Sequence, residues 1–394
     1  MKEKLVLAYS GGLDTTYCAV SLQKKYDIFS ALVNTGGFNT EELKEVEKRA
    51  YKLGVSKHIN LEETETYYQK IVKYLIFGNV LKNNAYPLSV SSERVHQAIS
   101  LINYAKKIGA KYIAHGSTGA GNDQIRFDMI FKILAPEIEI ITPIRDNKLT
   151  RNQEITFLKA NGVNEDFEKS KYSYNVGLWG TSVGGEETLT SDKAINEKAF
   201  LNQLEETEPQ SINIEFNQGE LCAFNGEKMS AVEVINKVEN IAKKYAIGRD
   251  YHIGDTIIGL KGRIAFEAAA ATVIVKAHHT LEKHTLTKWQ LQLKEQMAST
   301  YGMLLHDGQY LEPALRDMEA FLESSQKNVN GTVNIDLYPY RFMVSGIKSK
   351  NDLMNSEFGD YGEVNKLYTS DDIKGFTTII SNSLTIYNKI NGND

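Results

Sequence analysis

The chain has 394 residues, of which 42% are apolar and 24% charged, an ordinary globular composition with room for two or three domains. Its formal net charge of −5 gives no general attraction to nucleic acid, no apolar run approaches the length of a membrane span, and Met1–Lys4 leads directly into a strand pattern instead of a signal peptide. The two cysteines, Cys18 and Cys222, are too far apart for a Cys-x-x-Cys site, and we expect a cytoplasmic protein without nucleic-acid or membrane partners.

The first half of the chain alternates strand and helix patterns. In chain order these are a strand at Leu5–Tyr9, a helix at Thr15–Tyr26, a strand at Ile28–Val33, a helix at Thr40–Leu53, a strand at His58–Leu61, helices at Tyr67–Phe77 and Arg94–Ile108, a strand at Lys111–His115, a helix at Asp123–Leu134 and a strand at Ile138–Thr142. This order predicts an α/β fold, a doubly wound parallel sheet covered on both faces. Ligands of such sheets bind beyond the carboxyl ends of the strands, where the loops Ser10–Thr15, Asn34–Gly37 and Gly116–Asp123 begin.

The pattern changes after about residue 165, which predicts a nucleotide-binding domain over 1–168, an α+β domain over 169–368 and a C-terminal helix within 369–394. Tyr172–Glu187 is polar and rich in glycine and serine, and we predict a functional loop there. The later predicted elements are a hairpin at Ile212–Phe224, a helix at Ala231–Tyr245, a hairpin at Tyr251–Phe266, helices at Leu281–Tyr301 and Pro313–Gln326, strands at Thr332–Tyr338 and Arg341–Ile347, and a helix at Asp371–Ile390. The last helix has one apolar side, which suits packing on its own domain or on a partner subunit.

The turn Ser10–Thr15 directly follows the first strand and opens the first helix. Its glycines let backbone N–H groups approach an anion at the positive end of that helix, and its hydroxyls add further donors. Asp14 suits Mg²⁺ or a helix cap. The spacing fits neither a Walker A loop nor Gly-x-Gly-x-x-Gly, and an ordinary strand-to-helix turn is the plain alternative. The pattern Ser-Gly-Gly-x-Asp-Thr resembles the pyrophosphate loop of the N-type ATP pyrophosphatases, which split ATP between its α and β phosphates.

A second dense motif, Gly116–Phe127, follows the fourth predicted strand. Its three glycines allow close backbone approach, and polar side chains crowd the start of the next helix at Thr118, Asn122, Asp123 and Arg126. Asp123 and Arg126 are three residues apart, so they face the same side of a helix. A helix cap at Asn122 or Asp123 is the plain alternative, but it would explain one residue of the cluster and not the whole.

Together these motifs resemble the argininosuccinate synthase family. The matching segments are Ala8–Thr15, Ala114–Phe127 and Leu134–Pro136, with weaker matches at Tyr172-Ser173, Ser182–Gly185, Gly331–Val333 and Gly346–Ser349, in order along the whole chain. The pyrophosphate loop alone would also suit tRNA thiolases and glutamine-dependent synthetases. Thiolases commonly use cysteine chemistry that this chain lacks, and no segment here is suited to producing ammonia.

The resemblance implies a ligase of arginine biosynthesis that forms a carbon–nitrogen bond. Such an enzyme joins citrulline and aspartate through a citrullyl-adenylate and releases AMP and pyrophosphate. ATP is then a substrate, accompanied by Mg²⁺, and neither a tightly bound cofactor nor a metal site of the protein is expected. The resemblance also implies a homotetramer, in which Asp371–Ile390 could be an exchanged helix.

The resemblance assigns residues to each substrate. For ATP it implies Ala8, Tyr9, Ser10, Gly11, Gly12, Leu13, Asp14, Thr15, Thr16, Val33 and Gly116, with Ser10, Asp14 and Thr15 as the catalytic residues of the loop. For aspartate it implies Thr118, Asn122 and Asp123. For citrulline it implies Tyr86, Ser91, Asn122, Arg126, Ser173 and Ser182, together with the positions held by Gly254 and Phe266.

The chain departs from the family pattern near the acceptor. The family usually has a small residue after its second strand, where this chain has Val33. The family also places a Glu and a Tyr, twelve residues apart, around the amino-acid end of citrulline, and Gly254 and Phe266 stand at these positions. Asp255 could supply the carboxylate only through a one-residue shift, which turns strand side chains to the other face. The acceptor is therefore either citrulline, which we favour, or a different ureido compound.

The sequence supports two other interpretations less well. A non-catalytic nucleotide-binding protein would retain the predicted phosphate loop Ser10–Thr15. It has no use for Gly116–Phe127, the motif that the resemblance assigns to aspartate. The histidines His278, His279 and His284 have no strong metal spacing, and we expect them on a solvated or subunit-facing helix surface.

Overall fold

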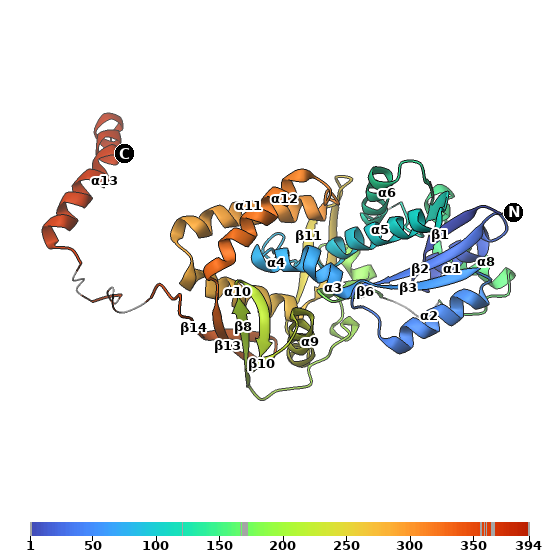
Figure 1. Cartoon of the computed structure of the whole chain (residues 1–394), viewed down its shortest axis with the longest axis horizontal. Coiled ribbons are helices and arrows are strands. Elements are labelled where there is room, and N and C mark those ends of the chain that lie inside the picture. The colour runs from blue at the N-terminus through green and yellow to red at the C-terminus, as the bar shows by residue number, and fades with distance from the viewer. Residues whose placement is uncertain are drawn as a thin grey trace.

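The N-terminal part of the chain folds around a parallel sheet (Figure 1). The structure is a computed structural model and describes residues 2–119, 121–165, 167, 172–354, 357, 359, 361–363 and 367–392. The strand order is β3-β2-β1-β4-β5, with β1 (Lys4–Ala8), β2 (Asp27–Asn34), β3 (Lys57–Glu62), β4 (Tyr112–Ala114) and β5 (Glu139–Ile141). Every neighbouring pair in this sheet is parallel.

Helices cover both faces of this sheet because its strands are apolar on both sides. Leu5 and Leu7 of β1 belong to one core, whereas Val6 points the other way and belongs to a second core. The first core is completed by α1 (Leu13–Leu22), α2 (Thr40–Lys52), α7 (Pro143–Asp146) and α8 (Arg151–Ala160), and the second by α5 (Ser89–Ile108) and α6 (Asp123–Leu134). The predicted doubly wound α/β fold is confirmed.

The strand order reverses at β1. The chain runs from β1 through β2 to β3 at one edge, and then returns to place β4 on the other side of β1. The loops after β1 and β4 therefore leave the same part of the carboxyl edge, which is where such sheets bind ligands.

The second half of the chain builds two antiparallel sheets. One has the order β10-β9-β8-β13-β14, with β8 (Gln210–Asn217), β9 (Glu220–Phe224), β10 (Glu227–Lys228), β13 (Gly331–Tyr338) and β14 (Arg341–Lys348). The other has the order β11-β12-β7-β6, with β6 (Ser173–Gly177), β7 (Gly180–Gly184), β11 (Arg249–Asp255) and β12 (Lys261–Glu267). The predicted α+β character of this part is confirmed, whereas the predicted boundary after residue 168 lies outside the described residues.

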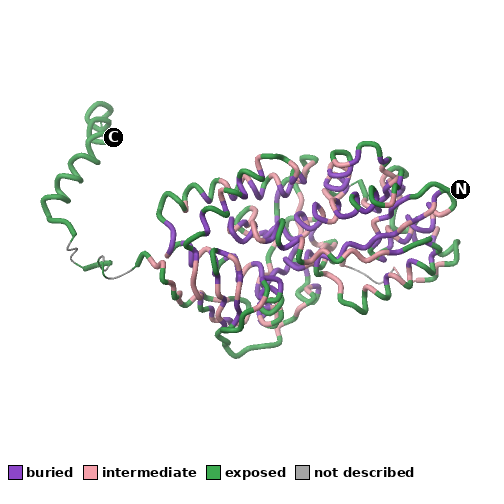
Figure 2. The backbone as a smooth tube through the Cα atoms, in the orientation of Figure 1, coloured by how far each residue is buried: buried purple, intermediate pink, exposed green. Residues whose placement is uncertain are grey.

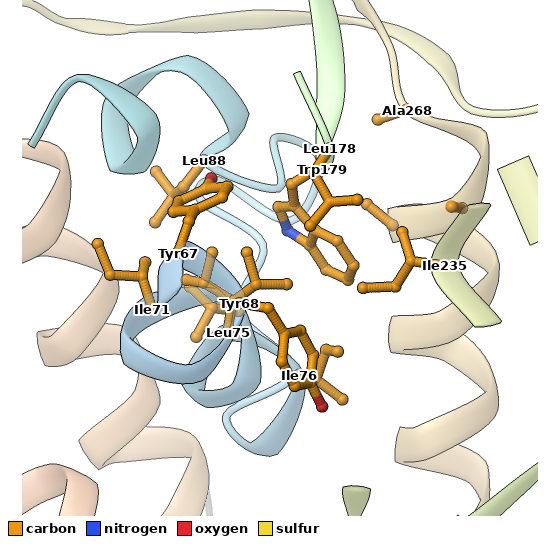
Figure 3. Packing of buried hydrophobic residues seen from close by; sticks show 14 of the residues in the cluster. Tyr67, Tyr68, Ile71, Leu75, Ile76, Leu88, Leu178, Trp179, Ile235 and Ala268 are labelled. Atoms are coloured by element: carbon orange, nitrogen blue, oxygen red, sulfur yellow. The ribbon is translucent and has the colours of Figure 1, made fainter. Parts of the chain in front are cut away.

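One continuous core joins the two halves. Leu178 and Trp179, in the turn between β6 and β7, pack with Tyr67 and Tyr68 of the first half and with Ile235 of the second (Figure 3). The helical segments around this core are α3 (Thr64–Tyr67), the π-helical η1 (Tyr68–Val72), α4 (Lys73–Phe77), α9 (Ala231–Ala242), α10 (Ala269–Thr285), α11 (Lys288–His306) and α12 (Pro313–Ser325). Short 3₁₀ turns are η2 (Glu186–Leu189), η3 (Glu197–Ala199), η4 (Lys243–Tyr245) and η5 (Gln326–Asn328).

The last helix, α13 (Ser370–Asn391), stands apart from the rest of the chain (Figure 1). All of its residues are exposed (Figure 2), including the apolar Phe376, Ile380 and Leu384. Its apolar side therefore meets no other described part of the same chain. No described helix is long and apolar enough to cross a membrane.

Three predictions about the second half are wrong. Tyr172–Glu187 is not a loop, because β6 and β7 form a hairpin whose second strand pairs with the distant β12. The helix predicted at Leu281–Tyr301 is two helices, since α10 ends at Thr285 and Thr287 caps α11. His278 is fully buried on α10, where its ring nitrogens bond to Asn79 and Gln326, so it is not on a helix surface.

Candidate active site

The Ser10–Thr15 turn leaves the carboxyl end of β1 and continues into α1. Gly11 has a φ of +79°, which glycine adopts without strain, and Arg49 of α2 donates a hydrogen bond to the Gly11 carbonyl oxygen at 2.6 Å. The hydroxyl oxygens of Ser10 and Thr15 lie 3.5 Å apart. Because the first N–H groups of a helix have no intrahelical partner, the start of α1 adds backbone donors beside these hydroxyls.

Several residues of the predicted ATP set have buried side chains. Tyr9, Leu13 and Val33 belong to the cores on either side of the sheet. The Tyr9 ring lies edge-on to His58 with centroids 6.0 Å apart, and the Tyr9 N–H donates to the carbonyl of Ala31 at 3.0 Å. These three side chains pack within the cores and hold the strands and the turn in place.

Gly116, the first residue of the second motif's loop, packs directly against the Ser10–Thr15 turn. A Cβ built on Gly116 would lie 3.0 Å from the Cβ of Asp14 and 3.2 Å from the backbone nitrogen of Thr15. A side chain at this position would need the two loops to move apart by a few tenths of an ångström, so the glycine allows their close packing. The structure thus brings together the two sequence motifs that were predicted to share one site.

Asp14 lies beside a second carboxyl group, that of Glu154 on α8, which the sequence motifs do not include. The Glu154 side chain is buried at 2% exposure. Burial, followed by the charge of Asp14 and the hydrogen bond with it, raises the pKa of Glu154 to about 8. Burial also raises the pKa of Asp14, although the hydrogen bond with Glu154 opposes that rise. The two carboxyl groups therefore share one proton near neutral pH.

This shared proton makes stability depend on pH. The pKa of Glu154 rises on folding from 4.5 to about 8, so the folded chain binds the proton more tightly and loses stability as the pH rises through that range. Glu154→Gln removes this titration. Between about pH 5 and about pH 8.5 we expect the Tm of the native chain to fall further than that of the variant. The additional fall should be about 2–4 °C for each kcal/mol of folding free energy that the raised pKa of Glu154 contributes. Circular dichroism melts measure this, with the exposed Glu186→Gln as control, and equal pH slopes for native chain and Glu154→Gln would contradict it.

The loop after β4 is held by a chain of polar contacts. His115 accepts a hydrogen bond from the Ser117 backbone N–H at its Nδ1, 3.2 Å away, and its Nε2 lies 2.9 Å from Oδ1 of Asp128. Arg145 forms an ion pair with the other oxygen of Asp128 at 2.8 Å and bonds Gln124 at 3.2 Å. Thr118 lies exposed on the loop that these contacts support.

Asp123 is fixed between two arginines at the start of α6. Its Oδ2 accepts from Nε of Arg94 at 3.1 Å, and its Oδ1 accepts from Nη1 of Arg126 at 2.9 Å. Burial would raise the pKa of Asp123, but the two guanidinium charges and their hydrogen bonds outweigh it and hold the pKa below its ordinary value. Asp123 is therefore ionised at neutral pH and is positioned from two sides.

Arg126 and Asn122 connect this motif to the second half of the chain. Nε and Nη2 of Arg126 both donate to the carbonyl oxygen of His306, at 3.0 and 2.8 Å. The Asn122 side chain makes no helix cap, and its oxygen accepts instead from the backbone N–H of Ile257 in the β11–β12 turn at 2.9 Å. The capping alternative for Asn122 is thus wrong.

The predicted acceptor residues of the second half lie on one face of the β11-β12-β7-β6 sheet, which we call the predicted acceptor face or, in short, the acceptor face. Ser182 pairs directly with Phe266 on β12, and Asn175 pairs with Ser182, so these side chains point the same way. The alternation of strand side chains adds Ser173 and Gly254 to that face. Asn175 accepts from Arg94 at 2.5 Å and donates to Ser182 at 3.2 Å, which links this face to Asp123.

Tyr86, just before α5, borders the same face, and Ser91 lies in the first turn of that helix. The Tyr86 hydroxyl accepts from the Val90 backbone N–H at 3.0 Å, and its ring lies 5.5 Å from the ring of Phe266. Ser91 is buried and donates to the carbonyl of Leu88 at 3.3 Å. In the described structure the Ser91 side chain therefore serves its own helix.

The loop after β2 meets the turn between β6 and β7. Asn34 accepts from the backbone N–H groups of Gly36 and Phe38 at 3.1 and 3.2 Å, which fixes the loop. A Cβ on Gly37 would lie 2.1 Å from the carbonyl oxygen of Val176, so this glycine permits backbone-to-backbone contact. The Ser10–Thr15 turn, the Gly116–Phe127 motif and the predicted acceptor face therefore lie around one edge of the parallel sheet.

Comparison with known proteins agrees with this arrangement. The model of the argininosuccinate synthase N-terminal HUP domain matches residues 4–164, and that of the C-terminal domain matches residues 172–387. The argininosuccinate synthase of Methanocaldococcus jannaschii is 39% identical over 92% of this chain and 93% of its own length, and that of Pyrococcus furiosus is 35% identical over 99% and 95%. The chain belongs to the argininosuccinate synthase family. The resemblance inferred from the motifs is confirmed.

Within this family fold, Asp255 cannot take the place of the missing Glu. The pairing of β11 with β12 continues without a shift through Gly254 and Gly262 to Asp255 and Lys261. Asp255 therefore points away from the acceptor face, and its exposed carboxylate forms an ion pair with Lys261 at 2.6 Å.

The two sequence motifs do not include several residues that contact the predicted site residues. Arg94 and Glu154 have no motif of their own, and only the fold brings them to Asp123 and Asp14. Glu93 is similar: it accepts from the Thr35 hydroxyl at 2.5 Å, and burial, partly offset by Arg94, raises its pKa to about 7. For Glu93 and Arg94, their position on α5, one turn after Ser89, was the available signal. Among the described residues, no cluster of three or more His, Cys, Asp or Glu is placed to hold a metal ion.

Proposed function

We propose that the chain catalyses the ATP-dependent joining of aspartate to citrulline, with release of AMP and pyrophosphate. The observation that carries this proposal is the packing of Gly116 against Asp14 and Thr15, because it sets the aspartate motif against the phosphate turn at one sheet edge. ATP would lie on the turn, the aspartate ammonium on ionised Asp123, and the ureido group between them.

The reaction needs alignment and charge stabilisation from the protein and no protein nucleophile. The ureido oxygen attacks the α-phosphorus of ATP, and the bond to pyrophosphate breaks. The donors of the Ser10–Thr15 turn would stabilise the departing charge. The aspartate amine then attacks the adenylated ureido carbon, loses a proton, and expels AMP, which carries away the former ureido oxygen.

The roles of the remaining site residues follow from their positions. Thr118 and Asn122 would bind aspartate beside Asp123, and Arg126 would orient the acceptor together with Ser182 and Ser173. Mg²⁺ would arrive with the phosphates of ATP. The carboxylate of Asp14 and the hydroxyls of the turn are oxygen donors that suit it. We propose the cytoplasm as the place of this reaction.

Product analysis tests this assignment. Incubation with ATP, aspartate and citrulline should release AMP and pyrophosphate in equal amounts, and omission of aspartate should stop net turnover. Release of ADP and phosphate would exclude the pyrophosphate-loop chemistry. ATP binding without AMP formation from any acceptor would instead favour a non-catalytic nucleotide-binding protein.

We further propose that the chain acts as a homotetramer that uses α13 as an intersubunit contact. Phe376, Ile380 and Leu384 are each more than 60% exposed and follow helical spacing, so the helix has an apolar side and no described partner within its own chain.

Truncation before Asp371 should therefore lower the mass in solution from four chains to a smaller assembly, as measured by light scattering. Asn382→Ala, on the polar side of α13, is the matched control and should leave the mass unchanged. An unchanged mass after truncation would remove α13 from the subunit contact.

A further inference from the structure

The acceptor face differs from the family pattern at Gly254, the position from which the family's Glu would extend. Gly254 and His252 lie on the same face of β11, two residues apart. A Cβ built on Gly254 would lie 3.1 Å from Cε1 and 3.2 Å from Nε2 of His252, and 3.2 Å from Nδ2 of Asn83. An imidazole and an amide therefore fill the space into which a carboxylate side chain would extend.

His252 is held in this position by aromatic neighbours. Its ring stacks on Tyr86 with centroids 4.8 Å apart and meets the ring of His306 edge-on at 5.8 Å. Tyr86 also packs against Phe266, which stands at the family's Tyr position without a hydroxyl. His252 is buried, with 8% of its surface exposed, and its Nδ1 has no hydrogen-bond partner in the described structure. This end of the face thus has an unsatisfied imidazole in place of an acidic group.

The charges around His252 are positive. Burial, followed by the charges of Lys82 and Arg126, lowers the pKa of His252 to about 4. Burial and the same two cations also lower the pKa of His306 to about 4, against an opposing effect of Asp307. Two neutral imidazoles therefore lie within the field of two cations at neutral pH.

The nearby carboxylates have other partners or another orientation. Asp123 is bonded to both Arg94 and Arg126. Asp307 lies 2.8 Å from Nδ1 of His306. Asp255 is on the opposite face of β11 and is paired with Lys261. In the described part of the chain, the groups that face the acceptor tail favour an anion, because an ammonium would lie near two cations without a free carboxylate.

We propose that the acceptor site selects ureido acids whose tail has a carboxylate and lacks the α-ammonium of citrulline. This inference rests on the proposed ligase function and changes the preferred acceptor from citrulline to a ureido acid without the α-amino group. Lys82, Arg126 and the imidazole N–H of His252 would receive the tail carboxylate, together with the Asn83 amide N–H that does not donate to the Ile253 carbonyl. Citrulline enters the same site, but its ammonium is left without an anionic partner.

The test compares three acceptors on the native full-length chain with ATP and aspartate, by kcat/KM for AMP release. These are citrulline, 5-ureidopentanoate (citrulline without its amino group) and 4-ureidobutylamine (citrulline without its carboxylate). Because an ammonium without an anionic partner is disfavoured in a buried site, we expect 5-ureidopentanoate to exceed citrulline by about 10- to 100-fold, which corresponds to about 1.4–2.7 kcal/mol. We expect 4-ureidobutylamine to be the poorest. Citrulline equal to or better than 5-ureidopentanoate, or good turnover of 4-ureidobutylamine, would overturn the inference and leave the ligase function standing. No AMP from any acceptor would overturn both.

A double variant tests whether His252 and Gly254 determine this acceptor preference. His252→Val/Gly254→Glu removes the imidazole and supplies the carboxylate in the space so vacated. The ratio of kcat/KM for 5-ureidopentanoate to that for citrulline should fall by about tenfold or more. Because both substrates are measured on one preparation, partial misfolding cancels from the ratio. Phe266→Tyr is the milder second variant and should shift the ratio in the same direction. An unchanged ratio in both variants would contradict the assignment of this subsite.

Discussion

Arg126→Ala should lose about 3–5 kcal/mol of folding free energy and at least about 100-fold in kcat/KM for both amino-acid substrates. The side chain is 4% exposed, and it gives three hydrogen bonds, two to the His306 carbonyl and one to Asp123. Its removal leaves a buried carbonyl without these donors and leaves Asp123 with Arg94 alone. Asp123 is then held from one side, so the substrate groups that it would orient lose their geometry.

Two further variants separate charge from geometry in this prediction. Arg126→Lys keeps the positive charge but loses the planar arrangement of donors, so it should recover part of the stability and little of the turnover. Arg341→Ala removes an exposed arginine of β14 and should stay within about 0.5 kcal/mol of the native chain. Urea unfolding measures the free energies, and AMP release at a temperature where every variant is folded measures kcat/KM. Native kinetics in Arg126→Ala would contradict the placement of this motif in the site.

Gly37→Ala should destabilise the chain by about 1–3 kcal/mol or more. The added Cβ would lie 2.1 Å from the carbonyl oxygen of Val176 and 2.9 Å from its carbon, both backbone atoms that cannot rotate away. The loop after β2 would have to move from the β6–β7 turn, and Thr35, which donates to Glu93, would move with it.

Gly346→Ala is the matched control for Gly37→Ala. Gly346 lies in β14, and a Cβ there would have no neighbour within 4 Å among the described residues. Restricting the unfolded chain should make this variant neutral or more stable by about 0.5–1 kcal/mol. The difference in free energy of unfolding between the two variants is the measurement, and equal values would show that the contact between Gly37 and Val176 does not hold the loop.

Sequence patterns predicted the parts of this molecule that are encoded locally. The Ser10–Thr15 turn was found because its glycines, its hydroxyls and the strand before it are contiguous. The Gly116–Phe127 motif was found for the same reason, and α6 begins at Asp123 as predicted. That both loops meet also followed from the alternating strands and helices, since a reversal of strand order brings such loops together.

The errors have physical causes of their own. The β6–β7 hairpin contains three glycines and several exposed residues, so its sequence has no clear strand pattern. Its partner strand β12 lies some eighty residues later, so no local pattern predicted the pairing. The N-terminal part of α10, from Ala269 to Thr280, was missed because the helix is buried on most of its sides and has only a narrow polar stripe. The capping box at Thr287 and Gln290 was the signal that would have divided α10 from α11.

The site's supporting residues could not be predicted from motifs. Arg94, Glu154 and His252 act through neighbours that are distant in sequence, so their roles appear only when strands and helices are assembled. The register of β11 with β12 settled a question that the sequence left open, because it turns Asp255 away from the acceptor face.

The most direct test of the central claim follows the ureido oxygen. An acceptor labelled with ¹⁸O in its ureido group is incubated with ATP, aspartate and the native chain, and the AMP is analysed by mass spectrometry. If the ureido oxygen attacks the α-phosphorus, each AMP should contain one ¹⁸O and the pyrophosphate none. AMP without the label, or label found in the pyrophosphate, would contradict the adenylated intermediate on which this account depends.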